Sequence, residues 1–372
     1  MPDLSPWAKN QCLRLLYKTC GTHALLPTEM KIPICYDRNN DALYSGGFAD
    51  VWKGQHCGRD VAVKVIRTFS NSDFRKLIKR FCKEAITWKI LRHPNVLPLI
   101  GVTMTEAKFA LVSDWMTNGN LNEFVEANPK ADRLKLRLLG DAARGLIYIH
   151  ERGVVHGDLK GANIVVDQSC RALLADFGML TIISGPTSFS STTSNAQADG
   201  TARWMSPERI APQDFGRKNS RPSKSSDCYS LGMVVYEVIS GHPPFHEDIK
   251  MAVLKKVVDG DRPRREKGFA DHLWNTLEQC WMPQPSERPS IEDVLQCLET
   301  CSNQEAEVME GNLHTISEPH ASRVMSRPSP SVDNLGGETI ALSRYGKNFP
   351  CFIQFILELI PPGLFRGSPG RH

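Results

Sequence analysis

Strand patterns and helix patterns occupy different parts of this 372-residue chain. From about 39 to 112 strands dominate, and DVAVKVI is the clearest because its β-branched residues alternate with others. From 119 to about 300 helical spacing dominates, and a short hinge at 113–118 joins the two parts. This segregation predicts an α+β chain with a small β-rich lobe and a larger, mainly helical lobe. Between two such lobes we expect a ligand-binding cleft.

Two helices stand out by their apolar patterns. In FRKLIKRFCKEAITWKILR, at 74–92, apolar residues recur at helical spacing, and one side carries Phe74, Leu77, Ile78, Phe81, Ala85 and Trp88. The segment CYSLGMVVYEVIS, at 228–240, is nearly all apolar, which predicts a buried helix. We therefore expect one long helix in the small lobe and a buried helix in the larger lobe.

The two ends of the chain differ from the part between them. Residues 1–38 are predicted to form a partly helical N-terminal extension. Residues 301–372 are rich in Ser, Pro, Glu and Gly, and we expect this low-complexity tail to be disordered. Within it, FPCFIQFILELI at 349–360 fits either a partner-binding or membrane-surface helix or simply a sticky terminal segment.

Charge and cysteine content restrict the protein class and the compartment. The formal charge of +4 comes from 45 basic and 41 acidic residues, and this near-balance argues neither for nor against a nucleic-acid partner. We expect no nucleic-acid partner. No apolar run approaches the ~20 residues that a membrane span needs. Eleven cysteines without a Cys-x-x-Cys pair are typical of free thiols, which predicts a soluble, cytoplasmic protein. Cys297 and Cys301 lie one helical turn apart without other metal ligands near them in the sequence, so we interpret them as helix-face or core residues.

Two segments of the small lobe have residue types that can hold phosphate. In YSGGFADVWKG, at 44–54, Gly46 and Gly47 would let backbone N–H groups approach phosphate oxygens, although the segment alone fits a β-hairpin turn equally well. Lys64 lies inside an apolar strand, where burial of its charge requires a partner, and Glu84 on the long helix is the obvious choice. The pair is either a structural salt bridge or a lysine held to bind the phosphates of ATP.

The segment HGDLKGAN, at 156–163, places three reactive groups within six residues. Asp158 would accept or orient the proton of an incoming hydroxyl, and Lys160 would neutralise charge on a transferring phosphoryl group. Asn163 would bind a metal ion, and Asp176 in the following ADFG would be the second metal ligand. Phosphoryl transfer depends mostly on positioning and charge stabilisation, so these groups must converge.

The chain resembles the eukaryotic protein kinase superfamily over about 43–300. The resemblance rests on VAVK, HPNVLPLIGV, HGDLKGAN, DFG, GTARWMSPE, SDCYSLGMVVYE and CWMPQPSERPS, in that order. GTARWMSPE and CWMPQPSERPS are most similar to the tyrosine-kinase-like branch. The resemblance implies the bilobal kinase fold, ATP and Mg²⁺ as cofactors, and a protein substrate phosphorylated in intracellular signalling.

The family pattern also implies roles for single residues. Lys64, Glu84, Asp158, Lys160 and Thr201 would form the catalytic set, with the Thr201 hydroxyl between Asp158 and Lys160. The adenine would lie against the hinge and against side chains that are equally compatible with ordinary core: Val51, Ala62, Ser113 at the gatekeeper position, Asp114, Met116 and Val165. Glu208 would pair with Arg288, and Asp227 would tie the buried helix to the catalytic loop. Lys160 and Thr201 favour Ser/Thr over Tyr as the acceptor, with dual specificity left open.

Two departures from the family pattern keep a second hypothesis open. Gly157 stands where most kinases have Arg, so we predict that activation-loop phosphorylation is not the main on-switch. Tyr44 and Ala49 replace two glycines of the phosphate loop, which predicts a raised KM for ATP. The alternative to an active kinase is a pseudokinase, an ATP-binding or scaffold module without turnover.

Overall fold

The computed structural model describes residues 15, 18–20, 22–23, 25–36, 41–45, 49–67, 74–104, 109–176, 181–182 and 201–315. Only the backbone is described for 74–76, 181–182 and 306–315. The chain divides into one compact unit at 1–306 and a second at 307–372. The predicted loop glycines Gly46 and Gly47 and the segment 349–360 lie outside the described residues.

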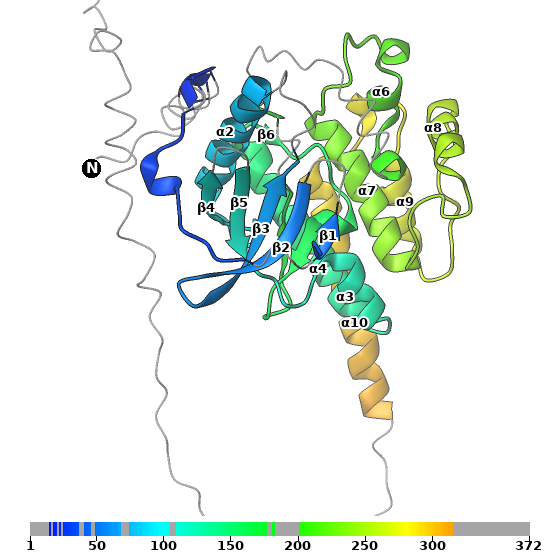
Figure 1. Cartoon of the computed structure of the whole chain (residues 1–372). Helices are drawn as coiled ribbons and strands as arrows, with labels where there is room; N and C mark the ends of the chain where they lie inside the picture. Colours follow the sequence, from blue (N-terminus) through cyan, green and yellow to red (C-terminus); the bar gives the residue numbers. More distant parts are fainter. Residues whose placement is uncertain are drawn as a thin grey trace, which may run out of the picture. The chain divides into compact units, whose positions relative to one another are not determined.

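The small lobe is built on a five-stranded antiparallel sheet (Figure 1). Its order is β1 (Tyr44–Ser45), β2 (Ala49–His56), β3 (Arg59–Ile66), β5 (Phe109–Asp114) and β4 (Leu99–Met104). Alternation along β3 sends Val61, Val63 and Val65 to one buried face. Ala62 and Lys64 consequently lie on the opposite face.

The segment before the sheet covers the face that carries the three valines. Ile32, Ile34 and Tyr36 pack against this cluster, following a short 3₁₀ turn, η1 (Thr28–Met30). The Ile32 N–H donates to the Val102 carbonyl at 2.9 Å, and Cys35 exchanges two backbone hydrogen bonds with Gln55. Residues 30–36 of the predicted N-terminal extension therefore lie against the small lobe.

One long helix, α2 (Phe74–Ile90), packs against β4 and completes the small lobe. Its buried side chains include Phe81, Ala85 and Trp88, as the apolar spacing predicts. The helix ends at Ile90, just before a turn closed by hydrogen bonding between His93 and Val96. Trp88 fixes that end, because its ring N–H donates to the Leu97 carbonyl at 2.5 Å.

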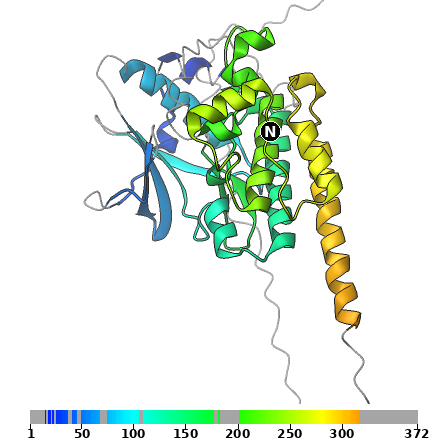
Figure 2. The same ribbon diagram turned by 90° about the vertical axis from the view of Figure 1, so that its right-hand side faces the viewer.

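Helices dominate the larger lobe (Figure 2). They are α3 (Leu121–Ala127), α4 (Asp132–Glu151), α6 (Pro207–Ile210), α7 (Lys224–Ser240), α8 (Lys250–Asp259), α9 (Asp271–Cys280) and α10 (Ile291–Thr315). Helix α7 is buried from Ser226 to Val238, as its apolar run predicts, and contacts α4 and α9. The bilobal α+β fold predicted from the sequence is confirmed.

Short strands frame the catalytic segment of this lobe. β6 (Val154–Val155) pairs with β9 (Thr181–Ile182), and β7 (Ile164–Val166) pairs with β8 (Ala172–Leu174). Three 3₁₀ turns, η3 (Gly161–Asn163), η5 (Thr201–Trp204) and η6 (Pro212–Phe215), lie among these elements, and η7 (Pro285–Glu287) precedes α10. The segment 156–163 is therefore held between two strands.

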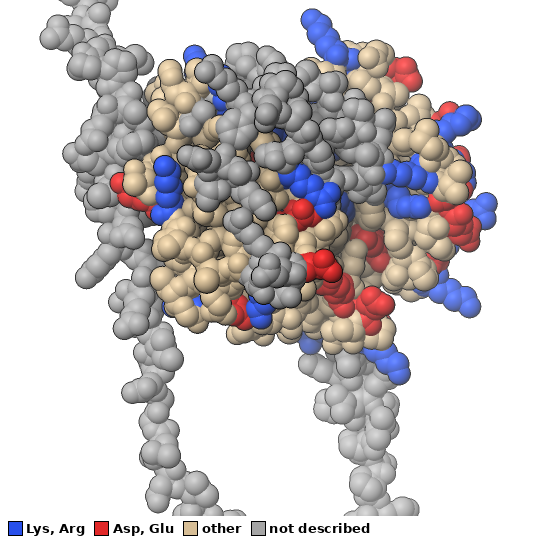
Figure 3. All heavy atoms as spheres, in the orientation of Figure 1, with Lys and Arg blue, Asp and Glu red and all other residues tan. Residues whose placement is uncertain are grey.

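The last helix is longer than the sequence pattern predicts. Helix α10 runs to Thr315, whereas the low-complexity tail was expected from residue 301. The added turns contain the helix formers Gln304, Glu305 and Ala306. The average composition of the tail does not reveal these residues, because Ser, Pro and Gly are its most frequent residues. No helix within the described ranges is long and apolar enough to span a bilayer. On the described part of the face in Figure 3, Lys and Arg side chains lie close to Asp and Glu side chains.

Candidate active site

Helix α7 anchors the catalytic segment through Asp227. Its Oδ2 accepts from the His156 backbone N–H at 2.8 Å, and its Oδ1 accepts from that of Gly157 at 2.9 Å. The His150 ring nitrogen lies 2.8 Å from Oδ2. Although burial opposes ionisation, the contacts with His150 and with the backbone lower the pKa of Asp227. The predicted tie between the buried helix and the loop is confirmed.

The glycine directly before Asp158 adopts a backbone conformation that favours glycine. Gly157 adopts φ 80°, a left-handed conformation in which a side chain is strained. The guanidinium of Arg209 donates to its carbonyl at 2.7 Å, and this arginine is itself buried. Arg209 follows Glu208, which forms the predicted pair with Arg288 through two hydrogen bonds of 2.7 and 2.9 Å. Sequence reasoning missed Arg209, because nothing in its spacing indicates contact with residue 157.

The three groups of the catalytic segment converge as predicted. The Asn163 amide donates to the Asp158 backbone carbonyl at 2.7 Å and to its carboxylate at 2.8 Å. The Lys160 ammonium lies 3.5 Å from the Asp158 carboxylate. The same ammonium donates to the Thr201 hydroxyl at 3.1 Å. Thr201, Lys160 and Asp158 are thus adjacent, with Thr201 contacting the lysine.

A buried carboxylate that the sequence analysis did not single out forms hydrogen bonds to this segment and to its neighbours. Glu237 on α7 accepts from the Gly161 backbone N–H at 3.0 Å, from Asn122 at 2.8 Å and from the Trp204 ring at 3.0 Å. Burial raises the pKa of Glu237 to about 6, against these three hydrogen bonds. At Gly161 an added Cβ would lie 1.8 Å from the Asn122 side chain, so a larger residue would displace the amide that donates to Glu237.

The predicted small-lobe residues share one face of the sheet. Val51 lies opposite Lys64 in the β2–β3 register, and Ala62 lies opposite Ser113 in the β3–β5 register. Lys64 donates to the Asp176 carboxylate in a short contact. The sheet therefore positions Lys64 against the residue that begins the DFG sequence, 112 positions later.

Lys64 and Glu84 form a looser pair than the sequence suggests. Their charged atoms are 4.0 Å apart, and Glu84 Oε1 is buried without a hydrogen bond among the described residues. Burial opposes the charge of Lys64, yet the carboxylates of Asp176, Glu84 and Asp158 together raise its pKa. Burial also raises the pKa of Glu84, while Lys64 opposes that rise. Lys64 thus stays cationic among three acids, as a phosphate-binding lysine must.

The donor set fits a divalent cation of the magnesium type. Asp176 supplies a carboxylate and adopts φ 56°, an unusual conformation that aspartate tolerates and that is frequent at functional sites. The amide nitrogen of Asn163 is engaged by Asp158, so its amide oxygen is the atom left for a metal. Hard oxygen ligands of this kind suit Mg²⁺.

The hinge residues lie at the end of β5. Ser113 is buried, and burial raises the pKa of its neighbour Asp114. The Trp115 N–H donates to the Asp60 carbonyl at 3.2 Å, and the Met116 carbonyl accepts from Gly119 at 3.1 Å. Val165 lies on β7, two residues past Asn163. The hinge thus follows the sheet that carries Lys64, and β7 directly follows the segment 156–163.

Known proteins resemble this chain over most of its length. Serine/threonine-protein kinase STY17 of Arabidopsis thaliana is 24% identical over 79% of this chain and 51% of its own length. Serine/threonine-protein kinase VIK of the same plant is 31% identical over 72% of this chain and 60% of its own length. Serine/threonine/tyrosine-protein kinase HT1, also from that plant, is 29% identical over 68% and 64%. The chain spans about half the length of the first curated relatives that it matches, with 51% and 48% covered.

The family comparison covers most of the two lobes. The family model described as protein tyrosine and serine/threonine kinase matches residues 38–298. The match includes every residue of the candidate site from Val51 to Thr201, and also the Glu208–Arg288 pair. Because more than half of the chain is matched, the chain belongs to the protein tyrosine and serine/threonine kinase family.

Proposed function

We propose that this chain is a protein kinase that transfers the γ-phosphate of ATP to Ser or Thr hydroxyls of protein substrates. The observation that carries the proposal is the convergence of Asp158, Lys160 and Asn163 beside Thr201, together with the Lys64–Asp176 contact. Phosphoryl transfer needs few covalent steps from the protein, so placement of charge is its main contribution.

Each residue has a defined task in this proposal. Asp158 orients the acceptor hydroxyl and accepts its proton, and Asn163 holds Asp158 in place. Lys160 stabilises charge on the transferring group, and Lys64 binds the phosphates of ATP. Asp176 and Asn163 would hold Mg²⁺, which neutralises phosphate charge when bound. Val51, Ala62 and Val165 would contact the adenine, whose ring would bond the backbone of Asp114 and Met116 beyond the gatekeeper Ser113.

The lysine–threonine contact supports Ser/Thr specificity. Lys160 is placed by Thr201 at 3.1 Å, an arrangement that the resemblance associates with Ser/Thr kinases. The relatives named above carry serine/threonine in their names, and one also carries tyrosine. We therefore propose Ser/Thr transfer, with tyrosine as a possible additional acceptor.

Two further proposals concern the cellular location of the protein and the binding of a partner. The described cysteines are all free, which supports a reducing, cytoplasmic location. The segment 349–360, outside the described residues, is proposed to bind a partner. The alternative function is an ATP-binding pseudokinase. It is favoured by Gly157 and by the replacement of loop glycines by Tyr44 and Ala49.

Phosphate transfer from labelled ATP with Mg²⁺ to a generic basic protein tests the proposal. Asp158→Asn should lower the rate by about a hundredfold or more, because the acceptor hydroxyl loses its base. Asp259→Asn, which changes a surface carboxylate paired with Lys255, should leave the rate unchanged. Phosphoamino-acid analysis should find label on Ser and Thr. If wild type transfers no phosphate while ATP still raises the melting temperature, the pseudokinase function replaces this one.

A further inference from the structure

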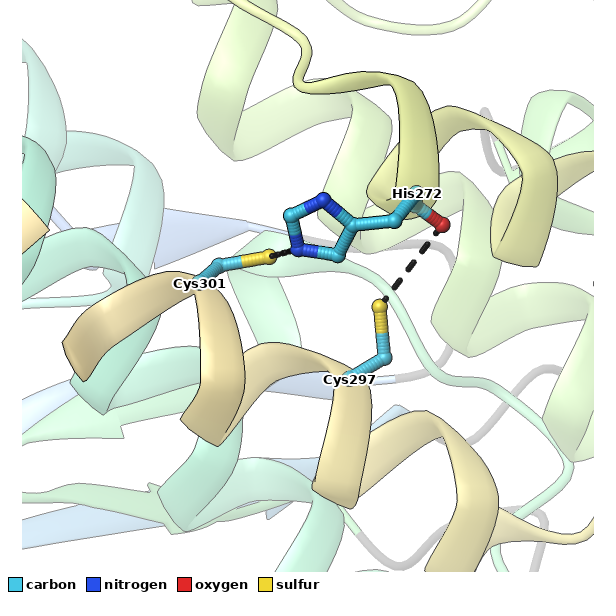
Figure 4. Close-up of side chains that lie close together, drawn as sticks. All are labelled: His272, Cys297 and Cys301. Carbon is cyan, nitrogen blue, oxygen red and sulfur yellow. Dashed lines mark hydrogen bonds between the residues drawn. The ribbon is translucent and has the colours of Figure 1, made fainter. Parts of the chain in front are cut away.

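Three metal-ligating side chains meet where α9 and α10 pack, apart from the phosphate-binding residues. His272 comes from the first turn of α9, and Cys297 and Cys301 lie one turn apart on α10 (Figure 4). The Cys301 sulfur is 2.9 Å from the His272 Nε2 atom. The Cys297 thiol donates to the His272 carbonyl at 3.8 Å and accepts from the Thr276 hydroxyl at 3.3 Å. Both sulfurs are therefore directed at the same histidine.

The spacing of these atoms approaches that of a metal site. The two sulfurs and the ring nitrogen all lie within 4.8 Å of one another. With Zn–S bonds of about 2.3 Å and a Zn–N bond of about 2.0 Å, tetrahedral coordination separates such ligands by roughly 3.5–4 Å. To reach those values, the Cys301–His272 separation of 2.9 Å must widen, and any separation near the 4.8 Å limit must narrow.

Two of the three residues in the cluster are partly exposed to solvent. Cys301 is buried, whereas His272 and Cys297 are partly exposed. Two thiolates and an imidazole are soft to borderline ligands, which favours zinc over magnesium or calcium. Three protein ligands with one accessible position match a zinc ion that also binds water.

We propose that His272, Cys297 and Cys301 bind one Zn²⁺ ion, with water as the fourth ligand. The ion links the start of α9 to α10 through one cysteine on each side of Leu298, where the match to the kinase family ends. It would hold the last helix to the preceding one, and it lies on other elements than the ATP and acceptor residues. This proposal is independent of phosphotransfer activity.

Metal analysis of the full-length chain tests the proposal. Protein purified with zinc and passed through a desalting column should retain about one zinc ion per chain by mass spectrometry. Cys297→Ser and Cys301→Ser should each lose most of that zinc. Cys57→Ser is the matched control. Cys57 also lies beside a histidine, 3.6 Å from the His56 ring, but among the described residues it belongs to no group of three potential metal ligands. It should retain the zinc.

Binding of Co²⁺ to the wild-type chain is a second test of the site. Metal-free wild type should bind one Co²⁺ with thiolate-to-cobalt absorption and with the visible bands of a tetrahedral ion. Its melting temperature should rise when zinc is added, because the metal binds the folded state. Wild type without zinc and without these cobalt bands overturns the proposal, even if the serine variants fail to fold. Equal zinc in wild type, Cys297→Ser and Cys301→Ser overturns it as well.

Discussion

At the scale of single residues, the site depends on a buried arginine that reaches the catalytic loop. Arg209 donates to the carbonyl of Gly157, the residue directly before Asp158. We predict that Arg209→Gln lowers the free energy of unfolding by about 1–3 kcal/mol, because it removes the donor to a buried carbonyl. The rate of transfer should fall with it, since the backbone before Asp158 is less constrained. Chemical unfolding and steady-state kinetics measure the two effects.

A charge-retaining change separates the two roles of this side chain. Arg209→Lys keeps the positive charge near Asp158 and Asp227 but loses the planar fork of donors. We expect a smaller loss of rate than in Arg209→Gln. Wild-type kinetics and stability in Arg209→Gln would contradict the role assigned to the contact with Gly157.

The buried carboxylate of Glu237 predicts a pH-dependent stability. Burial raises its folded-state pKa from 4.5 to about 6, so the folded protein holds this proton more tightly than the unfolded chain. The associated stability is fully present below pH 4.5 and is lost as the pH rises through about 6. Relative to Glu237→Gln, the wild type should therefore lose about 2 kcal/mol between pH 4.5 and pH 7.5. Urea unfolding of both proteins across this range measures the difference, and a constant difference would refute the assignment.

At the scale of the elements, the segment 28–36 lies too close to the sheet for any side chain at Gly101. An added Cβ there would lie 2.7 Å from the Met30 carbonyl and 2.8 Å from the Ile32 side chain. We predict that Gly101→Ala destabilises the protein by about 1–3 kcal/mol, because the segment must move off the valine cluster. Limited proteolysis should then cut within 25–36 sooner than in wild type.

Gly140 supplies the matched control for this change. It lies within α4, where an added Cβ would meet side chains no closer than 3.5 Å. Gly140→Ala should leave stability unchanged or raise it by up to about 1 kcal/mol, since alanine favours a helix. Equal melting temperatures for Gly101→Ala and wild type would show that the segment is not packed as described.

Elements were predictable from the sequence where their pattern is local. The alternation of β3, the spacing of α2 and the apolar run of α7 each report a buried face within one stretch of chain. The groups at 156–163 were predictable because they lie together in sequence. Contacts between distant segments were not: Glu237 lies 76 positions from Gly161, and His272 lies 29 positions from Cys301. The spacing of apolar residues along the chain does not indicate which loop or helix a side chain contacts after folding.

At the scale of the whole kinase unit, Tyr44, which precedes the predicted phosphate loop, forms a hydrogen bond between the two lobes. The Tyr44 hydroxyl, on β1 of the small lobe, donates to the Glu123 carboxylate at 3.0 Å. Glu123 belongs to α3 of the larger lobe, where the same oxygen also accepts from the Asn120 N–H and caps the helix. Tyr44 occupies the position of the first loop glycine in the family pattern. Replacement of that glycine by tyrosine therefore removes a flexible residue but adds the hydrogen bond to Glu123.

This contact predicts how ATP binding responds to changes at Tyr44. Tyr44→Phe removes the hydroxyl, and the loss of about 0.5–1.5 kcal/mol should weaken ATP binding about two- to tenfold, because the lobes close less firmly over the nucleotide. Tyr236→Phe is the matched control, since its hydroxyl contacts Glu266 at 2.7 Å within the larger lobe. It should leave ATP affinity unchanged.

Tyr44→Gly restores the glycine of the family pattern but also lacks the contact with Glu123. If Tyr44→Gly binds ATP more tightly than wild type while Tyr44→Phe equals it, the glycine matters and the contact between the lobes does not.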